Sequence, residues 1–446
     1  MFLPRLDGRA GGAPDFFVMV ETCPPKAAEV APVQRLSLRT NFLWSLAGNL
    51  VYAGCQWGML VVLAKLGSPI VVGEFALALA VTAPVMIFAQ LSLRSVQATD
   101  ARGEFAFSHY MSLRLFTTLG AMLVIAGLAA VGYSWHLGLV IVAVGFSKAF
   151  EGVSDVVHGF LQQREQMDRI SISMILKGPL SLLAVAAAIF CTGDLLVAAA
   201  ALAAVWALVL LAYDMRVAGT LLGRPPLALL VPRWTPEILR KLALLALPGG
   251  ITLALISFSG NVPRYFIERH LGTWELGIFA ALVYPTVAGS TVVGALGQSA
   301  MPRLAQHYAR GERAEFQRLL GRLLLIGLGI GVGGLVLIRA IGALVLELLY
   351  RPEYASHGEV FLWVGLSAGI GFVASFLGYG MTAARYFRAQ VPVFATVLLA
   401  TAGACAVLVP RYGLTGAAMA MGVGTLVQGL GSGLVVRHAL GRMPKS

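Results

Sequence analysis

The chain has 446 residues, of which 58% are hydrophobic and only 12% are charged, and its mean hydropathy is +0.81. A soluble domain of this size could not bury so much apolar surface, so the composition excludes a soluble globular protein and indicates a membrane protein. The net charge of +12 does not indicate nucleic-acid binding, because the basic residues alternate between loops and do not gather on one soluble face.

Residues 1–36 are rich in Pro, Gly and Ala and lack a continuous apolar stretch behind a basic start. They therefore do not resemble a cleaved signal peptide. We expect a disordered cytoplasmic tail here. Met19 is an alternative start, which would leave the first 18 residues untranslated.

The rest of the chain contains apolar segments, each close to the ~20 residues that a helix needs to cross a bilayer. Their approximate bounds are 41–65, 70–93, 110–131, 137–161, 172–191, 194–213, 242–266, 275–299, 319–341, 359–383, 391–409 and 414–436. They predict an all-α polytopic membrane protein with about 12 transmembrane helices.

The sequence also repeats itself. Gly73–Ala76 (GEFA) recurs as Gly277–Ala280 (GIFA) at an offset of 204, and Ala101–Glu104 (ARGE) recurs identically as Ala309–Glu312 at an offset of 208. At offsets of 208 to 221 the further pairs are Arg114 and Arg322, Gly159 and Gly380, Arg164 and Arg385, Gly193 and Gly413, and Arg216 and Arg437. A duplicated even number of spans predicts two pseudo-symmetric six-helix lobes with a substrate site between them. The expected bounds are an N-terminal lobe at 37–216, a cytoplasmic linker at 217–241 and a C-terminal lobe at 242–446.

The basic residues follow the segments in alternation. With the amino terminus inside, 26 of the 33 Lys and Arg residues fall in inner segments, and Lys148 alone lies in the middle of a span. The outer ends hold only six: Lys65, Arg264, Arg269, Arg339, Arg351 and Arg411. This positive-inside bias predicts that both termini lie in the cytoplasm.

The fourth segment carries the most charge. Its polar residues project within an arc of about 80° on one helical face; they are Lys148, Glu151, Asp155, His158 and Gln162. Charges inside a bilayer mark substrate or ion pathways, so Lys148 is a candidate substrate-binding residue and Glu151, Asp155 and His158 are candidate ion-coupling residues. The alternative is structural, since Lys148 and Glu151 lie three residues apart and can neutralise each other.

Polar stripes also lie on the first and seventh segments, and only that of the first is uncharged. On the first, Asn49 and Gln56 are candidate substrate-binding residues, because amides and hydroxyls suit the hydroxyls of sugars. The same groups serve equally well as hydrogen-bonding contacts between helices. On the seventh, Asn261 and Arg264 occupy the corresponding face.

Two arginines suit an anionic ligand. A guanidinium in an apolar helix, such as that of Arg264, matches the geometry of a phosphate or pyrophosphate, although an ion pair with Glu268 would also explain it. Arg94 ends the second segment and could meet an anionic headgroup from the cytoplasmic side, and positive-inside anchoring is its alternative explanation.

No pattern of catalysis is present. The sequence has no nucleophile elbow, no Walker loop and no His/Cys spacing of a metal site, and its outer loops are too short for a catalytic domain. We therefore expect no catalytic residues, no metal site and no cofactor.

The run from Asn41 to Asp100, with Gly48–Asn49, Gln56–Trp57 and Gly73–Ala76, resembles bacterial oligosaccharide flippases, as does the run from Glu151 to Gly178. This is the polysaccharide branch of the multidrug/oligosaccharidyl-lipid/polysaccharide exporter superfamily. The resemblance implies a V-shaped two-lobe bundle that moves a polyprenyl-pyrophosphate-linked oligosaccharide to the outer leaflet of the cytoplasmic membrane by alternating access. It implies Arg264, Lys148, Arg94 and Asn49 as cavity residues.

The partners expected on this basis are the lipid-linked oligosaccharide, membrane lipids, a polysaccharide polymerase and chain-length machinery, with no nucleic acid and a monomeric state. Three other classes remain open. A multidrug/cation antiporter of the same fold would use Glu151 and Asp155 as its carboxylates. A facilitator-type sugar transporter would also have twelve spans, but the residues from Leu91 to Glu104 lack its Gly-rich basic signature. A membrane glycan polymerase or ligase is the third class.

Overall fold

The computed structural model describes residues 37–100 and 103–443. The tail expected at 1–36 lies outside the described residues. Within the described part the chain forms helices and no β-strand, which confirms the all-α prediction.

The helices fall into two consecutive groups, which we call the N-lobe (α1 to α8) and the C-lobe (α9 to α15). The N-lobe contains α1 (Leu38–Leu66), α2 (Pro69–Gln90), α3 (Leu93–Thr99), α4 (Phe107–Gly132), α5 (Trp135–Gln163), α6 (Met167–Thr192), α7 (Leu195–Val209), a π-helical turn (Leu210–Asp214) and α8 (Met215–Leu222). A short 3₁₀ turn (Pro226–Leu230) follows. The C-lobe contains α9 (Pro236–Leu271), α10 (Thr273–Val283), α11 (Thr286–Ala309), α12 (Arg313–Leu349), α13 (Pro352–Ala355), α14 (Gly358–Ala383) and α15 (Phe387–Gly441).

Helix boundaries follow local sequence signals. Ser37 and Ser68 cap α1 and α2 by accepting hydrogen bonds from the backbone N–H groups of Thr40 and Val71. Helices also continue past the apolar residues into polar ends. As a result, the stretch between α8 and α9 (223–235) is shorter than the linker expected at 217–241.

The expected count of twelve spans is not confirmed by helix length and composition alone. Ten helices are long and apolar enough to cross a membrane, or eleven if α10 and α11, bent by 45°, form one span. The difference between eleven and twelve spans lies in α15, which is counted once although its 55 residues far exceed the ~20 that one span requires. Gly413 inside it has non-helical torsions (φ 57°, ψ −132°), and a Cβ on Gly416 would lie 2.0 Å from the carbonyl oxygen of Leu408. The chain therefore folds back at Gly413, between two of the expected segments.

The sequence repeat corresponds to a repeat of backbone conformation. Gly103 and Gly311, the glycines of the two ARGE motifs, both have positive φ, at 64° and 74°. Gly193 and Gly413 also both have positive φ, at 67° and 57°, although their ψ values differ (1° and −132°). Only glycine adopts the left-handed region without a steric cost, so these residues mark equivalent turns in the two halves.

The two lobes cross at the other repeated motif, which is GEFA in the N-lobe and GIFA in the C-lobe. A Cβ on Gly73 of α2 would lie 1.8 Å from the carbonyl oxygen of Thr273, and one on Gly277 of α10 would lie 1.8 Å from that of Pro69. No side chain fits at either position. The GEFA and GIFA motifs therefore place α2 and α10 in backbone contact, each through its own glycine.

Polar contacts between the C-terminal ends of α1 and α12 also join the two lobes. The Lys65 ammonium donates to the carbonyl oxygen of Leu348 (2.7 Å), and the Arg351 guanidinium donates to that of Lys65 (2.8 Å). Each cation thus binds a C-terminal carbonyl of a helix in the other lobe, where the helix dipole favours positive charge. The Trp57 indole N–H donates to the Tyr350 hydroxyl (3.0 Å) beside them.

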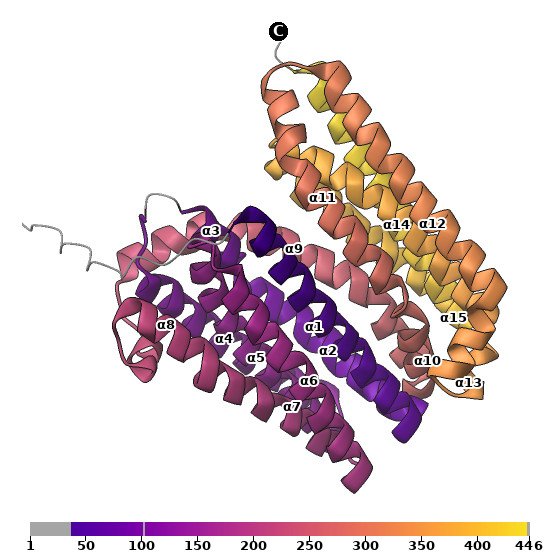
Figure 1. Ribbon diagram of the computed structural model, residues 1–446. Helices are drawn as coiled ribbons and strands as arrows, with labels where there is room; N and C mark the ends of the chain where they lie inside the picture. Colours follow the sequence, from indigo (N-terminus) through magenta and orange to yellow (C-terminus); the bar gives the residue numbers. More distant parts are fainter. Residues whose placement is uncertain (1–36, 101–102, 444–446) are drawn as a thin grey trace, which may run out of the picture. The chain divides into compact units, whose positions relative to one another are not determined.

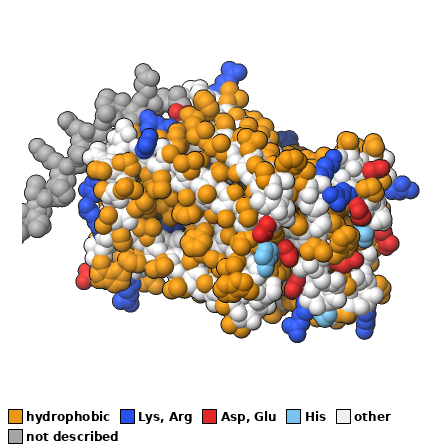
Figure 2. Space-filling model, turned by 90° about the horizontal axis from the view of Figure 1, so that it is seen from below, with side chains coloured by type: hydrophobic (Ala, Val, Ile, Leu, Met, Phe, Trp, Pro, Cys, Tyr) orange, Lys and Arg blue, Asp and Glu red, His pale blue; other side chains and the backbone are white. Residues whose placement is uncertain are grey.

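Hydrophobic side chains cover much of the face seen in Figure 2. Large apolar residues are exposed along several helices, such as Val131 (91%), Trp135 (83%) and Phe190 (79%). In water such a surface would be unfavourable, whereas lipid tails make it neutral. The surface confirms that this is a membrane protein.

Asp100 organises the loop between α3 and α4. Its carboxylate accepts hydrogen bonds from the backbone N–H groups of Glu104 (3.0 Å) and Phe105 (3.1 Å) and from the Tyr110 hydroxyl (3.3 Å). Burial raises the pKa of the Asp100 carboxyl, but these hydrogen bonds outweigh it and hold the pKa below its usual value.

We expect Asp100→Ala to lower the stability of the purified protein at pH 7 by about 1–3 kcal/mol, because two backbone donors lose a charged acceptor. Since the folded pKa is the lower one, the stabilisation is complete above the unfolded value of ~3.9 and disappears as the pH falls through the folded value. Thermal unfolding in detergent at pH 7 and at acid pH tests this. A gap between variant and wild type that does not narrow in acid would contradict it.

Candidate functional site

A charged cavity of about 130 Å³ lies inside the N-lobe, and we call it the N-lobe pocket. Side chains from α1, α2, α3, α5, α6 and α7 line it: Tyr52, Gln90, Arg94, Glu151, Ser154, Asp155, His158, Met174, Lys177 and Trp206. The polar face of α5 supplies four of these residues. Most of the pocket's chemistry therefore comes from one helical stripe.

Asp155 is held between two arginines. Its Oδ1 lies 3.2 Å from Arg94 Nη1, and its Oδ2 lies 3.5 Å from Arg114 Nη2. Arg94 also donates through Nε to Gln162 Oε1 (3.0 Å). The Arg114 side chain is fully buried, whereas that of Arg94 is 37% exposed. Arg94 is thus the accessible cation, with a second cation behind it.

A break between α2 and α3 places Arg94. Leu91 and Ser92 both have positive φ (49° and 53°), which costs free energy for residues other than glycine. The backbone of α9 packs against the break, where Cβ atoms on Gly249 and Gly250 would lie 3.1 Å from Ser92 and 3.0 Å from Leu91. The helix axis changes direction here and presents Arg94 to the pocket.

A second ion pair lies deeper. Lys177 Nζ is 2.8 Å from Asp214 Oδ2 and donates to Ser154 Oγ (2.7 Å), while the Ser154 hydroxyl donates to the same carboxylate oxygen (2.6 Å). His158 Nε2 lies 3.3 Å from Ser173 Oγ and 3.8 Å from Asp214 Oδ1. Lys177 and Asp214 are 3% and 1% exposed. Such burial is tolerated because the charges are paired and hydrogen-bonded.

Lys148 and Glu151 form the third pair, with 2.7 Å between Nζ and Oε2. This is the contact that the structural interpretation of the α5 stripe predicts. The ammonium groups of Lys148 and Lys177 also lie 5.6 and 5.5 Å from the ring centre of Trp206, which is within cation–π range. Trp206 therefore joins two of the three ionic clusters.

The charges do not cancel. The four cations in and behind the pocket are Arg94, Arg114, Lys148 and Lys177, and the three carboxylates are Glu151, Asp155 and Asp214. The surplus cation lies in the cluster around Asp155, where Arg94 is accessible. In a membrane environment such a site favours an anion, and guanidinium groups match phosphate oxygens best.

The structure brings together one part of the predicted site. Arg94, Glu151, Asp155 and His158 line the N-lobe pocket, and Lys148 binds Glu151 at its edge. The other four predicted residues, Asn49, Gln56, Asn261 and Arg264, are not among its lining residues. Their assignment to substrate binding stays a prediction.

Three of those four residues bond within their own helices. The amide of Asn261 donates to the carbonyl oxygen of Ser257 (2.8 Å), and its oxygen accepts from Arg264 Nη1 (2.6 Å). Among the described residues Arg264 forms no ion pair, so the expected alternative partner, Glu268, does not bind it. On α1 the Asn49 amide donates to the carbonyl oxygen of Ser45 (2.7 Å), and its neighbour on the same stripe, Tyr52, lines the pocket.

Sequence reasoning missed Asp214 and counted Arg114 and Lys177 only as basic residues of the cytoplasmic side. A signal was present for Lys177, because it lies inside an apolar segment, where a charge requires a partner. Asp214 ends the π-helical turn Leu210–Asp214, and such turns are frequent at functional sites. A π-helical turn has no sequence signature, so this partner was not identifiable.

We expect Lys177→Leu to destabilise the protein by about 3–5 kcal/mol, because it leaves the buried Asp214 carboxylate without its cation. The double variant Lys177→Leu/Asp214→Leu removes both charges and should recover most of that loss. Thermal unfolding of the two variants in detergent measures the difference. A double variant less stable than the single one would contradict the pairing.

The membrane-length helices define a multi-span membrane protein, and the charges buried among them mark a candidate functional site. Solved structures of transporters share its fold. The lipid II flippase MurJ in an inward closed conformation matches with a TM-score of 0.71 at 10% identity, covering 90% of each chain. A MATE transporter of Vibrio cholerae, VcmN, matches with 0.63 at 14% identity, covering 91% of this chain and 96% of that one. A MOP superfamily transporter from Pyrococcus furiosus matches with 0.60 at 16% identity over 91% and 95%.

The chain belongs to the polysaccharide biosynthesis protein family, whose model matches residues 38–308. A similar relative is the capsular polysaccharide biosynthesis protein CapF of Staphylococcus aureus, 26% identical over 394 residues, which are 87% of this chain and 96% of the relative. The family match confirms the sequence-based resemblance to proteins of polysaccharide biosynthesis, and the structural matches confirm that the chain has the fold of these transporters.

Proposed function

We propose that the protein is a flippase that moves a polyprenyl-pyrophosphate-linked oligosaccharide from the inner to the outer leaflet of the bacterial cytoplasmic membrane. The observation that carries this proposal is the N-lobe pocket, where Arg94 is an accessible cation in surplus over the nearby carboxylates. A pyrophosphate needs cationic compensation when it leaves the headgroup region. The family and the name of the CapF relative support a glycan as the other part of the substrate.

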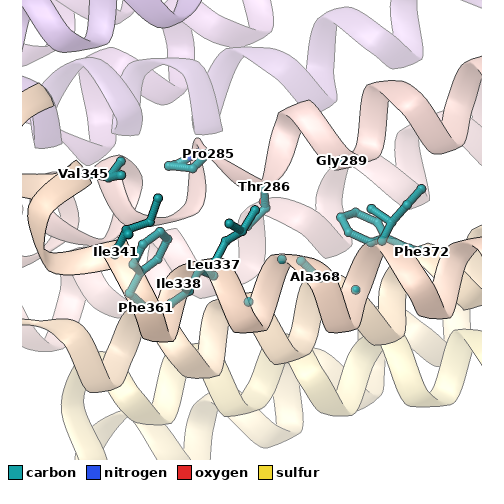
Figure 3. Close-up of a pocket in the computed structure, with 16 residues that line it drawn as sticks. Pro285, Thr286, Gly289, Leu337, Ile338, Ile341, Val345, Phe361, Ala368 and Phe372 are labelled. Carbon is teal, nitrogen blue, oxygen red and sulfur yellow. The ribbon is translucent and has the colours of Figure 1, made fainter.

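An apolar groove in the C-lobe supports the lipid part of the proposal. It has a volume of about 490 Å³, and residues of α11, α12 and α14 line it. Figure 3 shows Leu337, Ile338 and Ile341 along α12, with Phe361 beside them and Phe372 at the other end of the groove near Gly289. Several glycines of these helices leave the groove open. We assign the polyprenyl chain to this groove, because hydrocarbon is the chemistry that its lining accepts.

The proposed orientation places both termini in the cytoplasm, as the distribution of basic residues indicates. The ends of α1 and α12, joined through Lys65 and Arg351, then lie on the outer side. The structure is thus closed on that side at this contact, as expected of a state that receives its substrate from within. A polysaccharide polymerase and chain-length machinery would act on the product there.

The antiporter alternative has less support. It would require a carboxylate available to an organic cation, but Asp155 is held between Arg94 and Arg114, and Glu151 binds Lys148 at 2.7 Å. A bound cation would have to displace an arginine or a lysine. The surplus charge of the pocket also has the wrong sign for such a substrate.

Ion coupling through Glu151, Asp155 and His158 remains part of the proposal. In this structure each of the three has a partner. An ion could drive transport only by exchanging for one of these contacts in the other conformation. Asp155 is the strongest candidate, because its two arginines are the groups that a pyrophosphate would also bind.

The test is a reconstituted assay with purified protein in liposomes, in which flipping of a polyprenyl-pyrophosphate-linked oligosaccharide is measured beside drug/cation exchange. We expect flipping and no exchange, and the reverse result would establish the antiporter. Imposed proton, sodium and potassium gradients, applied to wild type and Asp155→Asn, test the coupling. Rates independent of every gradient and of the substitution would leave Asp155 with a positioning role.

A further inference from the structure

The C-lobe contains a second polar cavity, which we call the C-lobe pocket, with a volume of about 400 Å³. Residues of α9, α11, α14 and α15 line it: Thr252, Leu253, Ile256, Ser290, Val293, Gly294, Ser375, Gly378, Tyr379, Met381, Thr382, Gln390, Phe394 and Gln428. No Lys, Arg, Asp, Glu or His is among them. The pocket is therefore polar but uncharged.

This pocket occupies the position in the C-lobe that the N-lobe pocket occupies in the N-lobe. At the repeat offset of 204, Tyr52 and Gln90 of the N-lobe pocket correspond to Ile256 and Gly294 of the C-lobe pocket. At offsets of 220 to 221 the corresponding lining residues are Met174 and Phe394, Ser154 and Ser375, and His158 and Tyr379. One ancestral cavity thus exists twice, and only the N-terminal copy has kept or gained charges.

The hydrogen-bonding groups of the C-lobe pocket suit a neutral ligand with many hydroxyls. The hydroxyls of Thr252, Ser290 and Ser375 donate to carbonyl oxygens of their own helices, which leaves their oxygen lone pairs as acceptors. Gln390 donates to Thr382 Oγ1 (2.9 Å), and its carbonyl oxygen accepts no hydrogen bond from the part of the chain that the structure describes. The amide of Gln428 bonds to no described residue, so it offers both donors and an acceptor.

An aromatic ring forms one wall. The Tyr379 hydroxyl lies 3.4 Å from the carbonyl oxygen of Gly294, and the ring lies against Gly297, where a Cβ would be 2.1 Å from Tyr379 Cε2. Glycine at 297 is thus required to admit this ring. A flat apolar face beside hydroxyl and amide groups complements a sugar, which has apolar C–H faces and a polar rim.

We propose that the C-lobe pocket binds sugar residues of the lipid-linked oligosaccharide, while the N-lobe pocket binds its pyrophosphate. The inference rests on the proposed function and assigns a second binding site within it. The volume lies in the range of about 300–1,000 Å³ that small-molecule sites occupy. An organic cation is a poor ligand here, because no carboxylate is present to compensate its charge.

The experiment compares two probes on the full-length protein in detergent: the lipid-linked oligosaccharide extracted from the source cells, and synthetic polyprenyl pyrophosphate without sugar. We expect Gln390→Leu/Gln428→Leu to weaken binding of the oligosaccharide lipid by on the order of tenfold, since two hydrogen bonds are lost. Its dissociation constant for the sugar-free lipid should stay within about twofold of wild type. Gln306→Leu, which changes an exposed glutamine of α11, is the matched control.

The outcomes separate the two proposals. A double variant that binds the oligosaccharide lipid as tightly as wild type overturns the sugar site, as does an equal loss for both probes, which would show a structural role. Wild-type protein that binds both probes with equal affinity also overturns the sugar site and leaves the flippase proposal intact. Wild-type protein that binds neither probe refutes the proposed function itself.

Discussion

Replacing Arg94 by Glu should abolish flipping of the lipid-linked oligosaccharide without preventing membrane insertion. The substitution removes the accessible cation of the N-lobe pocket and places a second carboxylate beside Asp155, which now lies 3.2 Å from the guanidinium. A charge at the centre of a span costs insertion about 2.5–3.5 kcal/mol, and one near the end of a span costs less. Losing a charge-assisted contact to the pyrophosphate and adding repulsion should lower the transport rate by about 100-fold or more.

Two further substitutions make this result interpretable. Arg94→Gln keeps a hydrogen-bond donor near Gln162 but removes the charge, so we expect an intermediate loss of about tenfold. Arg216→Glu reverses an exposed cation of α8 and should transport like wild type. Protein levels and melting temperatures are measured beside the flipping rates. Full activity of Arg94→Glu would remove the N-lobe pocket from the substrate path.

The fold was largely predictable, because apolar segments of membrane length and glycines at the turns between them can be read directly from the sequence. The expected segments coincide with observed helices, although 70–93 and 275–299 each run across a break between two helices, and the repeated Gly193 and Gly413 both have positive φ. The turn inside α15 was predicted as well, because the expected segments 391–409 and 414–436 leave Gly413 between them. The break at Leu91 and Ser92 was not predicted, because neither residue is a glycine and the apolar segment 70–93 runs through it.

The site was only partly predictable. Helical periodicity correctly placed Glu151, Asp155 and His158 on one face, because that face depends only on spacing along α5. It could not identify the cations that meet this face, since Arg114 and Lys177 come from α4 and α6. Contacts between helices depend on their rotation and depth, which a single sequence does not determine. For the same reason the C-lobe pocket was not predicted, and its lining contains no charged residue that would have marked it in the sequence.

The crossing of α2 and α10 gives the second large effect. We expect Gly277→Ala to destabilise the protein by about 1–3 kcal/mol and Gly277→Val by more, because a Cβ would lie 1.8 Å from the carbonyl oxygen of Pro69 and the backbones must separate. If the protein is the flippase proposed above, transport should fall with both, since α2 and α10 join the two lobes that would move against each other. Gly127→Val, on an exposed part of α4 with open space around it, is the matched control.

The crossing is pseudo-symmetric, so the same effect is expected from a substitution on α2. Gly73→Ala meets the carbonyl oxygen of Thr273 at the same distance of 1.8 Å, so it should destabilise the protein as much as Gly277→Ala does. Either substitution separates the same two helices, and once they are apart a second Cβ meets less resistance. The double variant should therefore cost clearly less than the sum of the two single variants, which thermal unfolding of all three in detergent measures. Additive losses would mean that the two glycines act independently and that the repeated motifs are not a single joint between the lobes.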